Sequence, residues 1–137
     1  PFTNSNVNAY QVASLTTTKN EGCGVPNGEF AYFGGGYTPP LTSYTNSIEK
    51  FSMVTEANAT DIGNLSSSRS ELTPHVSTTH GYMAGGVVNN PPSSGSPPYA
   101  YGIATNTVDK FPFSSDGNSS DVADLVANQG SGAGTQG

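Results

Sequence analysis

Two histidines, His75 and His80, are the side chains of this chain best suited to bind a metal or to exchange protons near neutral pH. They flank residues 76–79, which are expected to form a short strand, and His80 with Gly81 falls where a hairpin turn is expected. Zinc needs further thiolate, imidazole or carboxylate ligands, and none stands beside these histidines at a suitable spacing. The pattern favours a role at a turn or strand end, and we predict no metal site.

Side-chain oxygens gather at 116–121, where Asp116, Asn118 and Asp121 offer ligands to a hard cation such as calcium. The segment lacks the spacing and the distal bidentate Glu of an EF-hand loop. Asn and Asp side chains commonly bond to backbone amides and hold turns. We therefore predict that these residues, and Asn58 and Asp61 before them, stabilise turns.

Glycines and a cysteine complete the candidates for chemistry. The glycines at 34–36 are followed by neither a helix nor a Lys with Ser or Thr, so a phosphate cradle is not indicated. Glycine at a strand end instead lets a neighbouring segment approach closely. Cys23 is the only cysteine, and no base or triad motif surrounds it or a serine. We predict a protein that is not an enzyme, with no catalytic residues and no cofactor.

Composition indicates what kind of scaffold carries these residues. Only 33% of the 137 residues are hydrophobic and 10% are charged, against roughly 45–50% and about 25% in an average globular domain. Seventeen Gly and ten Pro disfavour long helices and suit strands joined by many turns. A net charge of −6 excludes the basic surface that nucleic acid requires. The sequence contains no run of about 18 apolar residues, so we predict no insertion into a membrane. We predict an all-β protein.

The chain resembles itself at a fixed offset, which is typical of repeat architectures. Residues 46–51 (Asn-Ser-Ile-Glu-Lys-Phe) are matched 60 positions later by 106–111 (Asn-Thr-Val-Asp-Lys-Phe), and 58–65 are matched by 118–125. At an offset of 50, residues 8–15 match 58–65, and 32–36 match 82–86. The offsets differ because the loop 87–105 is ten residues longer than its counterpart, 37–45.

Each repeat predicts a short strand that ends in paired glycines, a Pro-rich loop, an alternating strand, a polar turn and a last short strand. Adjacent charges in the alternating strands, Glu49 with Lys50 and Asp109 with Lys110, point to opposite faces and cannot pair with each other. They can pair with neighbouring strands, and exposed pairs of this kind contribute only about 0–1 kcal/mol.

These repeats resemble the kelch repeat, in which a glycine doublet follows a strand and a valine, charged and aromatic strand comes next. The matching residues are Tyr82-Met83-Ala84-Gly85-Gly86, then Val108-Asp109-Lys110-Phe111, then 121–125, with the basic residue Arg69 ahead of the next strand pair. The tryptophan that kelch repeats carry in the last strand is absent, and Ile62 and Val122 stand nearest to its place. This degenerate form is similar to repeats in tail-fibre-like appendage proteins of marine bacteriophages.

The resemblance implies kelch-like β-propeller blades, of which a propeller typically needs four to eight to close. At this repeat spacing the chain holds about two and a half blades, so we expect a fragment of a larger propeller. We assign 1–127 to the repeat region, with copies near 1–45, 46–105 and 106–127. Residues 128–137 are rich in Gly and Ser, and we predict that they form a flexible tail.

The two Pro-rich loops are the best candidates for binding, because rigid β scaffolds usually carry recognition on their connections. Tyrosine combines apolar area with a hydrogen-bonding tip, and proline lowers the entropy lost on ordering. We therefore predict ligand contact by Tyr37, Tyr44, Tyr99 and Tyr101. The plain alternative is that both loops are spacers.

The function expected from this resemblance is a non-enzymatic structural or adhesive module of a virion or another extracellular assembly. Its expected partners are other copies of itself, other virion or appendage proteins, and a host glycan, with no nucleic acid and no membrane insertion. One alternative is a carbohydrate-binding or propeller domain of a secreted kelch-like enzyme. Another is the subunit of a self-assembling filament, because an open array leaves strand edges able to pair.

Overall fold

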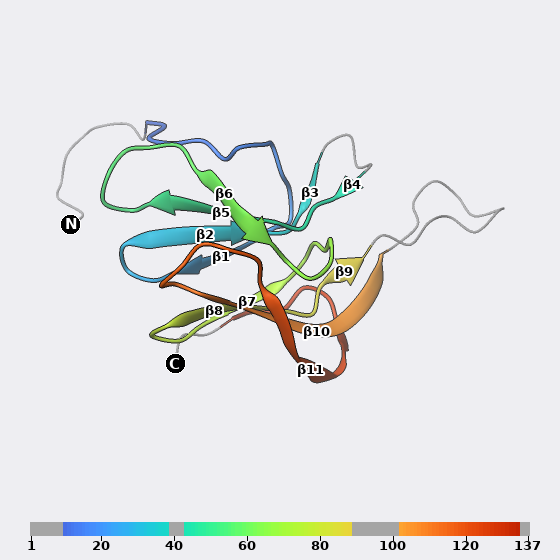
Figure 1. Cartoon of the computed structure of the whole chain (residues 1–137). Helices are drawn as coiled ribbons and strands as arrows, with labels where there is room; N and C mark the ends of the chain where they lie inside the picture. The colour runs from blue at the N-terminus through green and yellow to red at the C-terminus, as the bar shows by residue number, and fades with distance from the viewer. Residues whose placement is uncertain (1–9, 39–42, 89–101, 135–137) are drawn as a thin grey trace.

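The computed structural model describes residues 10–38, 43–88 and 102–134 (Figure 1). Over these residues the protein is all-β, with several antiparallel sheets and no helix, which confirms the predicted class. Accordingly, none of the described residues belongs to a helix that is long and apolar enough to cross a membrane.

The first sheet has four antiparallel strands in the order β1-β2-β5-β6. These are β1 (Cys23–Pro26), β2 (Phe30–Gly34), β5 (Ser47–Ser52) and β6 (Thr60–Asn64). Between β2 and β5 the chain forms a separate two-stranded ribbon from β3 (Tyr37–Thr38) and β4 (Ser43–Tyr44). Every neighbour in the sheet is also the next full-length strand along the chain, so the sheet is a simple meander.

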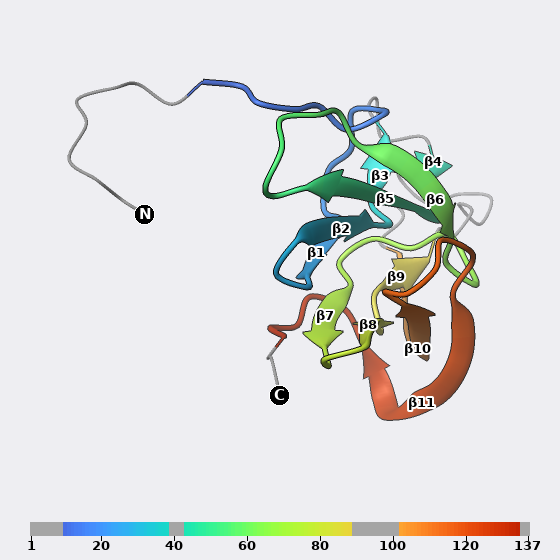
Figure 2. The ribbon, with the colours of Figure 1, turned by 60° about the vertical axis from the view of Figure 1, so that its left-hand side comes forward.

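The second sheet repeats this order as β7-β8-β10-β11. Its strands are β7 (Thr73–Val76), β8 (His80–Ala84), β10 (Ile103–Pro112) and β11 (Ser120–Gln129). The short β9 (Val87–Val88) pairs with the start of β10, in the place that the β3–β4 ribbon takes in the first sheet. Figures 1 and 2 both show the two sheets lying one over the other.

The tight turns between the first two strands of each sheet use the same device. Asn27 Oδ1 accepts hydrogen bonds from the backbone of Glu29 and Phe30, and Ser77 Oγ accepts from His80 N at the same place in the second sheet. The turn therefore begins at Ser77, which corrects our expectation of a strand over 76–79. The turn spans residues 77–79, because the Ser77 hydroxyl accepts a hydrogen bond from His80 N and so closes the turn before His80. His80 is therefore the first residue of β8 and not part of the turn.

The core lies between the two sheets. The ring centroid of Tyr32, in β2, lies 5.1 Å from that of Phe113 and 5.3 Å from that of Phe111. Phe111 belongs to β10 of the second sheet, and Phe113 directly follows that strand. A Cβ added at Gly34 would collide with the Met83 side chain, so this glycine permits the close approach. The buried residues of this core are Cys23, Val25, Tyr32, Ile48, Leu65, Leu72, Met83 and Phe111.

Strand register assigns each sheet two faces, because residues directly opposite in an antiparallel pair project to the same side. We call one the Tyr–Lys face, which carries Tyr32 and Lys50 in the first sheet and Tyr82 and Lys110 in the second. The other, the acid–Phe face, carries Phe33, Glu49 and Phe51 in the first sheet and Met83, Asp109 and Phe111 in the second. The Tyr–Lys face of the first sheet packs on the acid–Phe face of the second.

Three residues at corresponding positions adopt a left-handed backbone although none is glycine: Glu21, Glu71 and Ser131, at φ 54°, 54° and 53°. They are linked in series, since Glu71 N donates to Glu21 O and Ser131 N donates to Glu71 O. The segment 128–137 therefore begins inside β11, and its residue Ser131 is bonded to the connection that enters the second sheet.

Candidate functional site

Tyr37 and Tyr44, two of the predicted ligand-binding residues, lie directly opposite each other in the β3–β4 ribbon. Their ring centroids are 6.3 Å apart with the planes tilted by 56°, and both side chains are half-buried. Tyr37 is also tied to Asn20 by two backbone hydrogen bonds of 2.9 Å, which anchor the ribbon to the chain before β1. The structure therefore brings these two predicted residues together as a fixed aromatic pair.

Tyr99 and Tyr101, the other two predicted residues, lie outside the described residues. Gly102, which directly follows Tyr101, lies beside Tyr44, because a Cβ added at Gly102 would be 3.1 Å from Tyr44 Oη. The short strands β3, β4 and β9, which flank the two loops, lie at the same end of the molecule in Figure 1. In the second sheet the places of Tyr37 and Tyr44 are taken by Val87 and Ala104.

The two acids of the alternating strands, Glu49 and Asp109, are buried, whereas Lys50 and Lys110 are only partly buried. Asp109 in β10 is fully buried and pairs with Arg69, which is also fully buried and lies just before β7. Arg69 Nη1 further donates to Gly85 O at 2.9 Å and Thr107 O at 3.1 Å. Burial lowers the pKa of Arg69, and the attraction of Asp109 opposes that shift.

A matching pair occupies the first sheet, where Lys19 meets Glu49 with their side chains 1% and 0% exposed. Glu49 Oε2 also accepts a 2.6 Å hydrogen bond from Thr16 N. Burial alone would raise the pKa of Glu49, but the hydrogen bonds from Lys19 and Thr16 outweigh it, so the pKa lies below its ordinary value.

Sequence reasoning missed both pairs because each cation lies on the connection before its sheet, far along the chain from the acid. A usable signal was present, since Lys19 and Arg69 are 50 residues apart and stand at the same distance before the first strand of their sheets. In both pairs the acid and the cation are buried against each other, so we assign them a structural role.

The remaining candidates lie apart from one another. Cys23 is only 6% exposed, and burial raises its pKa to about 12, so its thiol stays protonated and unreactive. His80 Nδ1 bonds to Thr79 Oγ1 at 2.8 Å. No group of three His, Cys, Asp or Glu side chains among the described residues could hold a metal ion.

The polar turns hold backbone amides, but in part across sheets. Asp61 Oδ1 accepts from Gly63 N within its own strand. Asn118 Oδ1 accepts from Asn64 N at 2.9 Å, which joins the second sheet to the first. Asn58 Oδ1 accepts from Ser14 N, which joins the first sheet to the chain before β1. Asp116 instead forms an ion pair with Lys50 across the two sheets, at 2.5 Å.

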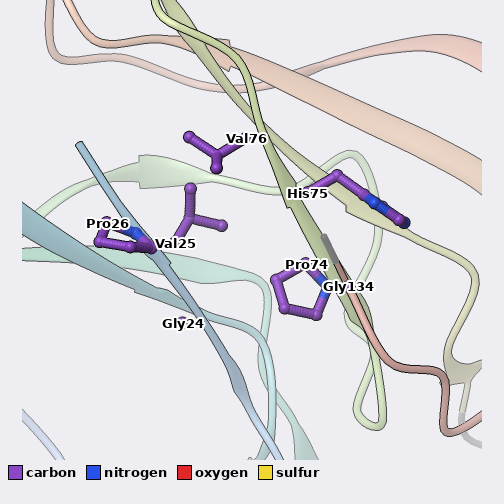
Figure 3. Close-up of a pocket in the computed structure, with 7 residues that line it drawn as sticks. All are labelled: Gly24, Val25, Pro26, Pro74, His75, Val76 and Gly134. Carbon is purple, nitrogen blue, oxygen red and sulfur yellow. The ribbon is translucent and has the colours of Figure 1, made fainter. Parts of the chain in front are cut away.

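A small pocket of about 160 Å³ opens between β1 and β7 (Figure 3). Val25, Pro26, Pro74 and Val76 give it apolar walls, and Gly134 closes one side. His75 borders the pocket, yet its ring points away from Val25 and Pro26 in Figure 3. The pocket offers space for a few apolar atoms and no group that would react with them.

The sequence matches no protein-family model, and no curated protein matches it significantly.

Proposed function

We propose that the two sheets are successive blades of a kelch-like β-propeller and that the chain is a non-enzymatic adhesive module that recognises a surface glycan. The observation that carries the proposal is the paired tyrosines, Tyr37 and Tyr44, fixed on a ribbon beside the second loop. The expected setting is a viral tail or capsid appendage, and the expected location is the virion or the extracellular space.

The blade arrangement is supported by the two stacked meanders, which have the same strand order and the same internal ion pair. The first strands, β1 and β7, lie side by side and share a pocket, as the innermost strands of neighbouring blades do. The glycine pairs of both sheets form the same backbone hydrogen bond to the segment that follows the sheet: Gly36 N donates to Arg69 O, and Gly86 N donates to Gln129 O.

Glycan recognition is supported by the chemistry of the loop end. A sugar ring offers apolar C–H faces and several hydroxyls, and a tyrosine offers an aromatic face together with a hydrogen-bonding tip. The ribbon holds both rings before any ligand arrives, which lowers the entropy lost on binding. By contrast, the interior acids and cations are already engaged with each other, as expected of a scaffold.

The test replaces the tyrosine pair by the residues that the second sheet carries at the same positions, in the variant Tyr37→Val/Tyr44→Ala. Binding to an array of bacterial surface polysaccharides and oligosaccharides should fall by about tenfold or more, as expected when aromatic contacts at a binding site are lost. Tyr82→Ala serves as the control, because Tyr82 lies on a sheet face away from the loops. Unchanged binding by the double variant would contradict the proposal.

The proposed setting has its own measurement. Mass spectrometry of purified virus particles should find peptides of this chain in particles from the same source. Their presence only among secreted proteins of uninfected cells would contradict the viral setting while leaving glycan recognition open to the array experiment.

A further inference from the structure

The two sheets expose complementary faces on opposite sides of the molecule. The first sheet's Tyr–Lys face is covered by the second sheet, so Tyr32 is 2% exposed and Ile48 is 0% exposed. The same face of the second sheet has no sheet upon it among the described residues, and Tyr82 and Val108 are half-buried there. The uncovered face thus repeats a surface whose natural cover is visible in the same molecule.

The cover that this face requires is the acid–Phe face of a similar sheet. In the internal contact, Tyr32 meets Phe111 and Phe113, and Lys50 meets Asp116. Their counterparts on the first sheet are Phe51, Met53 and Glu56, each 60 positions earlier. Phe51 is half-buried, and Met53 is 47% exposed.

Charge is complementary as well. Lys110, the counterpart of Lys50, forms no ion pair among the described residues and lies 6.0 Å from the centre of the Tyr82 ring. Glu56, the counterpart of Asp116, accepts a hydrogen bond from Tyr10 and is otherwise exposed. One copy therefore carries the free cation, and the far side of the same chain carries the acid that would meet it.

We propose that two copies of this chain associate head to tail, with the Tyr–Lys face of the second sheet of one copy covered by the acid–Phe face of the first sheet of the other. This contact repeats the internal contact between sheets and places Lys110 against Glu56. It is heterologous, so it extends to a ring or an open filament depending on the rotation per copy. The inference rests on the proposed succession of blades and is independent of glycan recognition.

The arrangement requires two segments to move. In the first copy, Ser131 N donates to Glu71 O just as Glu71 N donates to Glu21 O, so residues 129–134 hold the place that residues 19–24 of the incoming copy would take and must leave it. Residues 10–15 run beside β6 in the way that residues 60–65 run beside the second sheet: Ala59 N donates to Ser14 O, as Ser119 N donates to Asn64 O. In the incoming copy, residues 10–15 therefore occupy the place that β11 of the first copy would take. Residues 10–15 bury little side-chain surface, since Tyr10 is 71% exposed and Val12 is 52% exposed. We therefore expect β11 of the first copy to displace residues 10–15 of the incoming copy.

Sedimentation velocity on the full chain over a concentration series tests the contact. We expect concentration-dependent association that Lys110→Glu and Glu56→Lys each weaken by about tenfold, because each places like charges face to face. An equimolar mixture of the two variants should associate like the unaltered chain, because every contact in the mixture can pair opposite charges. Glu29→Lys makes the same charge change in the exposed β1–β2 turn and should have no effect.

Displacement of residues 10–15 gives a second readout. Tyr10→Ala releases Glu56 and should strengthen association, whereas an interface elsewhere would be indifferent to it. A chain that stays monomeric at every concentration overturns the proposal. The proposal is also overturned if Lys110→Glu and Glu56→Lys leave the association unchanged, or if a mixture of these two variants does not restore it. Loss of glycan binding in the tyrosine-pair variant without any change in association would separate the two proposals.

Discussion

The first and second sheets follow nearly the same residue pattern, yet corresponding side chains have very different surroundings. Tyr32 is 2% exposed and packs on two phenylalanines, whereas Tyr82, 50 positions later, is half-buried and has His80 as its ring neighbour at 6.5 Å. The two tyrosines occupy the same strand position on the same face. Burial is therefore decided by which sheet lies on top, and the local sequence decides only the direction of the side chain.

The internal ion pairs show the opposite behaviour, because both are fully buried. Lys19–Glu49 and Arg69–Asp109 are buried to a similar extent although, among the described residues, only the second sheet has its acid–Phe face covered by another sheet. They differ in their supporting bonds. Asp109 also accepts hydrogen bonds from Ser66 and Ser119, whereas Glu49 has the amide of Thr16.

The largest expected effect comes from breaking the second sheet's pair. Arg69→Met should lower the free energy of unfolding by about 3–5 kcal/mol, because Asp109 would stay buried without its cation. Two carbonyls, of Gly85 and Thr107, would also lose a donor. Lys19→Met should cost less, since Lys19 makes fewer bonds. Urea unfolding measures both.

The double variant Arg69→Met/Asp109→Leu provides the control. Replacing both charges by apolar groups should recover much of the loss, because no buried charge is left unpaired. If Arg69→Met alone unfolds at the same urea concentration as the unaltered chain, the pair does not hold the second sheet together.

The next effect contrasts the two tyrosines directly. Tyr32→Ala should lower the free energy of unfolding by about 3 kcal/mol, as expected when a large aromatic side chain is removed from a packed core. Tyr82→Ala should cost about 1 kcal/mol or less under conditions in which the chain is monomeric. Thermal unfolding of the two variants in parallel gives the comparison. Equal losses would mean that Tyr82 is covered in solution.

The smallest effect is the pH dependence contributed by Glu49. Its pKa is lowered in the folded state, so its ionised form stabilises the fold above the ordinary pKa of glutamate, about 4.3. This stabilisation should disappear as the pH falls through the lower, folded-state value. In Glu49→Gln, unfolding followed from pH 6 down to about pH 2 should show a shallower loss of stability than in the unaltered chain. An identical slope would argue against the pairing with Lys19.

Local patterns in the sequence predicted the strands well where they were regular. The alternating residues 47–51 and 106–111 lie within β5 and β10, and the glycine pairs follow β2 and β8 as expected. The strand predicted over 76–79 holds only for Val76, the last residue of β7, because Ser77 caps a turn and serine is equally acceptable in a strand. Tyr37 and Tyr44 were named individually, but their pairing depends on the register of a two-residue ribbon.

The buried charges could not be found by the same means. Alternation assigns Glu49 and Asp109 to a face, and an acid on a strand is ordinarily exposed. Their burial depends on Lys19 and Arg69, which reach them from connections that have no regular pattern. Only a comparison of the two halves of the chain links each acid to its cation.

The left-handed residues Glu21, Glu71 and Ser131 bear on how such a protein can change in evolution. Each marks the same joint, so a stretch of gene that runs from one joint to the next encodes a complete four-stranded sheet with its own loop and internal acid. Unequal recombination between two joints would add or remove one such unit without altering the geometry of those that remain. The number of sheets and the character of their loops can then vary independently of each other.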